Sequence, residues 1–215
     1  MIQLEVWGPY ALFTRGEMKV ERVSYDVPTP SAARGIVESL YYHPGIRWHI
    51  RRIYVLNPIE FTTIRRNEVK SKILGGTAMR IAQGKEDAPY LVTTKQIVQR
   101  ASMVLTNVHY VIEAEFEMLP EKAAPGDNPG KFQDIVTRRM RKGQCFSTPY
   151  FGCREFPAHF KQWEGGPIPT IDETRDLGFM LYDFDYSDPQ NITPLYFRVK
   201  MEHGVIQVAG CEVFR

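Results

Sequence analysis

Residues 126–142, GDNPGKFQDIVTRRMRK, join a glycine- and proline-containing loop to a run of positive charge. The pattern predicts a helix over residues 130–142, with Phe132, Val136 and Met140 on one apolar face. Four cations share the opposite face of this helix: Lys131, Arg138, Arg141 and Lys142. We therefore expect one face to pack on a sheet and the other to present positive charge to phosphate groups.

A nucleotide-hydrolysing P-loop is not expected in this segment. The spacer between Gly126 and Gly130 is one residue short, and Lys131 is followed by Phe132 rather than by the Ser or Thr that ligates magnesium. Lys131 lies instead in the first turn of the predicted helix, where unpaired N–H groups and the helix dipole favour an anion. The alternative is that Lys131 is only a solvated surface residue.

A second helix is predicted over residues 31–42, before Pro44-Gly45. Its apolar residues recur at helical spacing: Ala33, Ile36, Val37 and Leu40. Arg34 and Tyr41 are seven residues apart, so we expect them to project together beside the apolar stripe. A tyrosine beside a cation can position a ribose or a phosphate, although packing is the commoner role of such a residue.

The strands predicted around these helices define the fold class. Alternating, β-branched or aromatic stretches indicate strands at residues 2–8, on either side of Asn57-Pro58, at 101–119 and at 149–156. The order βαββαβ predicts an α+β fold of the ferredoxin-like (RRM-like) type, and three later strand-like runs predict a β-rich C-terminal extension. The expected domains are a ferredoxin-like domain over 1–157, with an inserted loop at about 73–100, and a small β-sheet region over 158–215.

Composition restricts the class of protein. The 215 residues carry 43% hydrophobic residues, no apolar run of membrane-spanning length and no signal-peptide pattern, so we expect a cytoplasmic protein. Its three cysteines include no Cys-x-x-Cys pair, so no zinc site is expected. The net charge of +2 does not itself predict a nucleic-acid partner, but the basic residues cluster locally, in residues 47–72 as well as in 131–142. The alternative is two solvated charged faces.

Three blocks of the sequence resemble a known family: VPTPSAARGIVESLYYHPGIRW, VLNPIEFTTIRRNEV and RRMRKGQCFSTPYFGCREF. They are similar to the CRISPR-associated RAMP endoribonucleases of the type I-C system, the Cas-five-d (also called Cas-five-c) family, over residues 1–160. The resemblance implies an RRM-like ferredoxin fold with a β-sheet extension. It also implies an antiviral-defence nuclease that cuts CRISPR repeat RNA without metal or cofactor and then holds the 5′ handle of the guide RNA. Its partners would be the backbone and large subunits of the interference complex.

The resemblance also assigns roles to residues. The tyrosine of the family's ES-hydrophobic-Tyr motif falls on Tyr41, and the lysine of its Gly-Lys motif falls on Lys131. One family member has a histidine directly after that lysine, whereas this chain has Phe132, which cannot move a proton. His43 is then the nearest candidate in sequence for proton removal.

RNA contacts are expected from basic residues in both clusters and in the first helix. The candidates are Arg34, Arg47, Arg51, Arg65, Arg66, Arg138, Arg141 and Lys142. The alternative function is a non-catalytic scaffold that binds guide RNA within the same complex.

Overall fold

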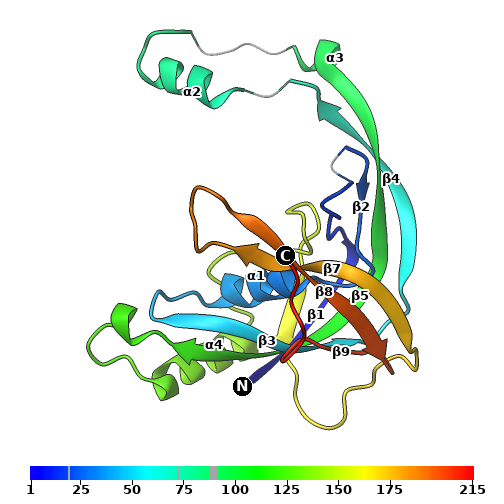
Figure 1. Cartoon of the computed structure of the whole chain (residues 1–215), viewed down its shortest axis with the longest axis vertical. Coiled ribbons are helices and arrows are strands. Elements are labelled where there is room, and N and C mark those ends of the chain that lie inside the picture. The colour runs from blue at the N-terminus through cyan, green and yellow to red at the C-terminus, as the bar shows by residue number, and fades with distance from the viewer. Residues whose placement is uncertain (19, 72, 88–91) are drawn as a thin grey trace.

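A computed structural model describes residues 1–18, 20–71, 73–87 and 92–215. In this part of the chain the fold is mixed α/β, with few helices and one nine-stranded, mostly antiparallel sheet in the order β6-β1-β5-β3-β9-β8-β7 (Figure 1). Both β2 and β4 pair with β5, and β2 does so in parallel. The strands are β1 Ile2–Ala11, β2 Arg22–Val23, β3 Ile46–Val55, β4 Glu60–Val69, β5 Ile97–Met118, β6 His159–Gln162, β7 Arg175–Asp185, β8 Thr193–Glu202 and β9 Val205–Gln207. The helices are α1 Pro30–Leu40, α2 Gly75–Ala82, α3 Thr93–Gln96, the short 3-10 helix η1 Pro120–Lys122 and α4 Pro129–Lys142.

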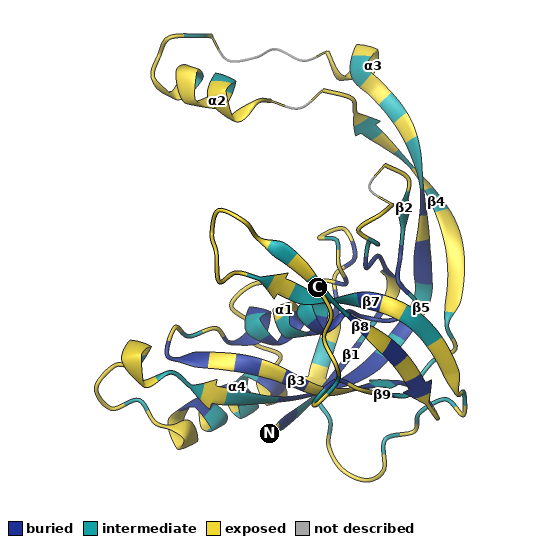
Figure 2. Ribbon diagram, viewed as in Figure 1, coloured by how far each residue is buried: buried dark blue, intermediate teal, exposed yellow. Residues whose placement is uncertain are grey.

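The hydrophobic core lies between the central strands and the helices α1 and α4. Alternate residues of β1, such as Leu4 and Val6, are fully buried, a similar alternation runs along the first half of β3, and the middle of β5 is buried on both faces (Figure 2). Helix α1 lies against β3 and β7, whereas α4 lies against β6 and the end of α1. The two helices that carry the predicted chemistry are therefore fixed on one side of the sheet.

Both predicted helices are confirmed, with boundaries that local residues explain. Asn128 caps α4 by accepting a hydrogen bond from the Lys131 N–H at 2.9 Å, and Pro129 occupies the first helical position. Gly143 ends this helix in the left-handed conformation at φ 62°. The predicted apolar face is buried as expected, and α1 ends at Leu40 because Tyr41 is already extended.

The strand predicted at residues 149–156 is wrong. This segment is an irregular loop in which Gly152 adopts φ 78°, and the next strand, β6, begins at His159. Phe151 donates its N–H to the Phe156 carbonyl at 2.8 Å, which closes a local turn. Phe151 and Phe156 are buried by packing of the loop, not by pairing in a ladder, whereas Tyr150 is exposed.

Strands β4 and β5 form a long hairpin arm beyond the body of the protein. The predicted break at Asn57-Pro58 is confirmed, since it separates β3 from β4. Helices α2 and α3 lie at the far end of the arm (Figure 1), and α2 buries none of its residues. Residues 88–91 of the insertion predicted at 73–100 lie outside the described residues, and the insertion itself stays a prediction.

The three C-terminal strands predicted from the sequence are confirmed as β7, β8 and β9. They continue the main sheet, because β9 pairs with β3 through Ile53 and Ile206. Among the described residues, no helix combines the length and apolar character needed to cross a membrane.

We predict that Gly152→Ala destabilises the protein far more than Gly166→Ala. Both glycines have positive φ, so each substitution carries the left-handed cost of roughly 1–2 kcal/mol. A Cβ at Gly152 would lie 2.0 Å from the Leu12 carbonyl oxygen, whereas nothing lies within 4 Å of a Cβ at Gly166. The backbone clash should add roughly 1–3 kcal/mol to the loss in the free energy of unfolding, measured by denaturant titration. Equal losses in the two variants would contradict the packing of this loop against β1.

Candidate active site

The end of α1 and the start of α4 meet at the buried ring of Phe132. The Tyr41 ring centroid lies 5.9 Å from that of Phe132, and the His43 ring lies 4.8 Å from it. The Lys131 Nζ atom lies 5.9 Å from the same ring centroid. The structure thus brings together Tyr41, His43 and Lys131, which the sequence analysis had selected separately.

Phe132 itself is a packing residue. Its side chain is 1% exposed and also packs edge-on against Phe116 of β5, with 6.2 Å between the two ring centroids. The prediction that it continues the apolar face of α4 is therefore confirmed. A phenyl ring in this position holds the neighbouring polar groups in place without taking part in proton transfer.

Asp127 joins two of the three candidate residues and was missed in the sequence analysis. Its Oδ1 accepts a hydrogen bond from Lys131 Nζ at 2.8 Å, and its Oδ2 lies 3.7 Å from His43 Nε2. The Ala124 N–H also donates to Oδ2 at 2.8 Å, and the carboxylate is 1% exposed. The signal that could have found it is its spacing of four residues before Lys131, directly ahead of the helix cap.

The ion pair between Asp127 and Lys131 sets both protonation states. The hydrogen bond from Lys131 lowers the pKa of Asp127, and the same bond raises the pKa of Lys131. Lys131 is therefore a full cation at neutral pH. Its side chain remains 49% exposed, so the ammonium is accessible to a phosphate group.

His43 is held by hydrogen bonds at the end of α1. The Gly45 N–H donates to His43 Nδ1 at 3.0 Å, so this nitrogen carries no proton and the neutral ring is protonated at Nε2. That Nε2–H faces Asp127. Neither ring nitrogen has a free lone pair in this arrangement, which suits His43 to holding the Asp127 carboxylate in place.

Tyr41 is held as a neutral phenol. Burial raises its pKa, although the charges of Lys131 and Arg139 act in the opposite direction. The Arg139 guanidinium lies 5.1 Å from the centroid of the Tyr41 ring and donates a hydrogen bond to the Leu40 carbonyl. This arginine, which was not among the predicted site residues, therefore closes the end of α1 and covers Tyr41.

The comparisons with known proteins place the chain in a family. A family model described as a CRISPR-associated protein, Cas_Cas5d, matches residues 1–209. The chain belongs to the Cas5d family.

Two relatives are named CRISPR pre-crRNA endoribonuclease Cas5d. The protein from Mannheimia succiniciproducens is 46% identical over 96% of this chain and 94% of its own length. The protein from Thermus thermophilus is 35% identical over 96% of this chain and 90% of its own length.

Two solved structures share the fold. A crystal structure of a CRISPR-associated protein has a TM-score of 0.70 and 23% identity, covering 100% of this chain and 96% of the other. A functionally uncharacterized protein from Streptococcus mutans has a TM-score of 0.69 and 21% identity, with the same coverage.

The expectation that Arg34 and Tyr41 project together is wrong, because the two side chains of this Cas5d-family chain have different partners. The Arg34 guanidinium forms a two-point ion pair with Asp183 of β7, with Nη2 3.0 Å from Oδ1. Tyr41 follows the last residue of α1 and packs toward α4. Helical spacing therefore did not apply to this pair.

The other predicted RNA-contacting residues occupy two regions. Arg138, Arg141 and Lys142 are exposed on α4. At the usual helical rise, the stretch from Lys131 to these residues is about 15 Å long. Arg47 and Arg51 are exposed on β3, whereas Arg65 and Arg66 belong to the arm strand β4. Arg51 pairs with Glu115 and Arg66 with Glu155, each at 3.2 Å. Their contact with RNA stays a prediction.

No group of three or more His, Cys, Asp or Glu side chains in the described ranges is arranged to hold a metal ion. The polar cluster around Phe132 instead offers one lysine cation, one neutral phenol and one carboxylate that is already paired. Its chemistry is that of anion stabilisation.

We predict that Asp127→Asn lowers the pKa of Lys131. The substitution removes the carboxylate that stabilises the protonated amine, so the proton is lost at lower pH. The measurement is an NMR titration of the Lys131 side chain. Asp134→Asn is the matched control, because Asp134 lies three residues beyond Lys131 and is exposed. A pKa change of the same size in both variants would show that the ion pair between Asp127 and Lys131 is not the cause.

Proposed function

We propose that this chain cleaves the repeat RNA of a precursor CRISPR transcript and then stays on the 5′ handle of the mature guide. Two relatives at 46% and 35% identity carry the name pre-crRNA endoribonuclease. The observation that carries the proposal is that the Tyr41 ring and the Lys131 ammonium both lie 5.9 Å from the centroid of the Phe132 ring.

The proposed reaction is cleavage by the substrate's own 2′-hydroxyl group, without metal. The 2′-oxygen, deprotonated by hydroxide, attacks the adjacent phosphorus, and the 5′-oxygen leaves and takes a proton from water. The products therefore end in a 2′,3′-cyclic phosphate and a 5′-hydroxyl. Alignment of these three atoms is a large part of the acceleration in intramolecular reactions of this kind. The site has then to hold the phosphate in line and stabilise its growing negative charge.

Lys131 is the proposed stabiliser of that charge. Its ammonium is exposed beside the capped start of α4, and Asp127 keeps it protonated. Preorganised donors of this type contribute about 10²–10³ to the rate. Asp127 and His43 act as positioning residues, because they fix the lysine amine on one side and are fixed themselves by backbone N–H groups.

Tyr41 is the proposed hydrogen-bond donor to the substrate. Its raised pKa keeps the phenol protonated, so it donates to a phosphate oxygen or to the 2′-oxygen and does not remove a proton. Arg139 and Phe132 hold the ring between them. None of the described side chains of this cluster is placed as a free general base, so hydroxide removes the 2′-OH proton in this proposal.

The proposed setting is a type I-C interference complex in the cytoplasm. The exposed cations of α4 and β3 would hold the guide RNA, and the complex's backbone and large subunits would contact the chain. A non-catalytic guide-binding scaffold is the alternative, and it needs the same basic surfaces without the chemistry at Lys131.

The ferredoxin-like arrangement is proposed for the part of the chain that carries this site. Its support is the strand order β6-β1-β5-β3 with antiparallel neighbours, and the position of α1 and α4 in the chain order β1-α1-β3-β5-α4-β6. Since β6 ends at Gln162, we place the end of this proposed domain after β6 rather than at residue 157. The C-terminal strands and the 73–100 insertion are then additions to it.

We predict that Lys131→Ala lowers repeat-RNA cleavage in EDTA by about 10²–10³. RNA binding should fall by no more than about tenfold, because one phosphate contact of several is lost. The measurement is single-turnover cleavage, with separate binding titrations, on the repeat RNA encoded with this chain. Lys200→Ala removes an exposed lysine of β8 and is the charge-matched control.

Two results of this experiment would contradict the proposal. Wild-type protein that binds the repeat tightly without cutting it supports the scaffold alternative. Cleavage that Lys131→Ala and Lys200→Ala leave equally intact removes Lys131 from the chemistry.

We predict that the logarithm of the cleavage rate rises with pH at a slope of about one between about pH 6 and 8, because hydroxide acts as the base. His43→Gln should leave this slope unchanged, since its role is positional. The measurement is the single-turnover rate of both proteins across the range. A plateau that appears in the wild type and disappears in His43→Gln would identify His43 as the general base instead.

A further inference from the structure

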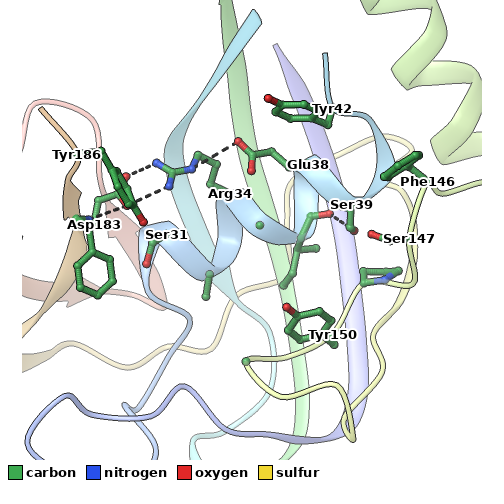
Figure 3. A pocket seen from close by; sticks show the side chains of 16 residues that line it. Ser31, Arg34, Glu38, Ser39, Tyr42, Phe146, Ser147, Tyr150, Asp183 and Tyr186 are labelled. Carbon is green, nitrogen blue, oxygen red and sulfur yellow. Dashed lines mark hydrogen bonds and ion pairs between the residues drawn. The ribbon is translucent and has the colours of Figure 1, made fainter. Parts of the chain in front are cut away.

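A cleft of about 570 Å³ lies beside α1, between β7 and the loop that follows α4 (Figure 3). Arg34, Glu38 and Tyr42 line it from α1 and the residues after it, Phe146 from the loop, and Asp183 from β7. It is distinct from the Phe132 cluster, and neither the mechanism nor the basic clusters use it.

Aromatic side chains surround the cleft and remain exposed. Tyr42 is 61% exposed, Phe146 is 78% exposed and Tyr186 is 59% exposed. Large aromatic side chains grouped at a cleft in this way indicate a binding surface rather than packing. Aromatic rings are the usual platforms on which unpaired nucleic-acid bases stack.

The charges inside the cleft favour a base over a phosphate. Arg34 is neutralised by its two-point contact with Asp183, as Figure 3 shows. The Glu38 carboxylate lies 3.6 Å from Arg34 Nε and accepts no hydrogen bond within the described ranges of the chain. Two carboxylates against one guanidinium give the cleft a negative excess, which repels phosphate and attracts N–H donors. Burial raises the pKa of Glu38, so this carboxylate, held only by its ion pair with Arg34, gains from receiving donors.

The cleft adjoins the candidate active site through the end of α1. Tyr42, which lines the cleft, directly follows Tyr41, which packs against Phe132. The Ser39 carbonyl accepts hydrogen bonds from the backbone N–H groups of Phe146 and Ser147, at 2.8 and 3.1 Å. This fixes the aromatic loop to the same helix end. Under the proposed function, an RNA strand whose phosphate meets Lys131 would therefore reach the mouth of the cleft.

We propose that this cleft binds one unpaired RNA base next to the scissile phosphate and that Glu38 selects guanine. Guanine presents N1–H and N2–H side by side, which matches the two oxygens of a carboxylate, while the aromatic rings stack on its faces. The position beside a scissile phosphate rests on the proposed function. The base preference does not, because it follows from the chemistry of the cleft alone.

The test measures binding of the full chain to short single-stranded oligouridylates that carry one central guanosine, inosine, adenosine or cytidine. Inosine lacks only the N2 amino group, so it isolates the second hydrogen bond. Wild-type protein should bind the guanosine probe about tenfold more tightly than the inosine probe, the effect expected from one hydrogen bond to a charged group. Glu38→Gln should reduce this ratio to within about twofold, since the amide offers one acceptor instead of two. Tyr42→Ala should weaken all four probes.

Glu202→Gln is the matched control, because it makes the same change at an exposed position of β8 and should keep the tenfold ratio. Equal affinity for guanosine and inosine in the wild type overturns the proposal, as does an unchanged ratio in Glu38→Gln. A cleft that instead receives an arginine side chain of a partner protein would show no base preference, which also overturns it.

The same probes separate this inference from the proposed function. Lys131→Ala should keep the guanosine preference, because Lys131 does not line the cleft. Loss of cleavage with an intact base preference counts against the nuclease alone. Intact cleavage without a base preference counts against the cleft alone.

Discussion

The burial of Phe132 is the interaction on which the candidate site depends. The ring belongs to the first turn of α4, yet it is enclosed by Tyr41 and His43 from the segment after α1 and by Phe116 from β5. Hydrophobic packing is non-directional, but here it joins the end of one helix to the start of another. The polar groups at the edge of the Phe132 ring take their positions from this packing. Lys131 is therefore accessible and is still held in place by Asp127.

Helical periodicity made half of this arrangement predictable. The spacing of Phe132, Val136 and Met140 identified the buried face of α4, and with it the exposed cations. The same reasoning was wrong for Arg34 and Tyr41, because a seven-residue spacing places side chains together only while the helix continues. Helix α1 ends at Leu40, whose carbonyl accepts a hydrogen bond from Arg139 of α4. That long-range contact has no signature in the local sequence.

The remaining errors have the same origin in contacts between distant segments. Residues 149–156 were predicted as a strand, but Gly152 fits against the Leu12 carbonyl with positive φ, so Phe151 and Phe156 are buried through a loop. Strand β9 joins the C-terminal strands to β3, a pairing that composition and periodicity do not specify. Asp127 was missed because its contact with His43 bridges segments far apart in sequence. The order of the main strands and of α1 and α4 was largely readable from sequence, whereas the contacts that complete the site were not.

Under the proposed function, the presence of Phe132 after Gly130-Lys131 fits a nuclease that retains its product. General acid–base catalysis contributes about 10²–10⁴ to a rate, and this cluster offers no free base to supply it. A protein that stays on its guide RNA cuts once, so a modest rate suffices. Contacts that bind substrate and product equally do not accelerate the reaction. In the proposed function the exposed cations along α4 would therefore serve retention, and only the ammonium of Lys131 would have to interact more strongly as charge grows on the phosphorane.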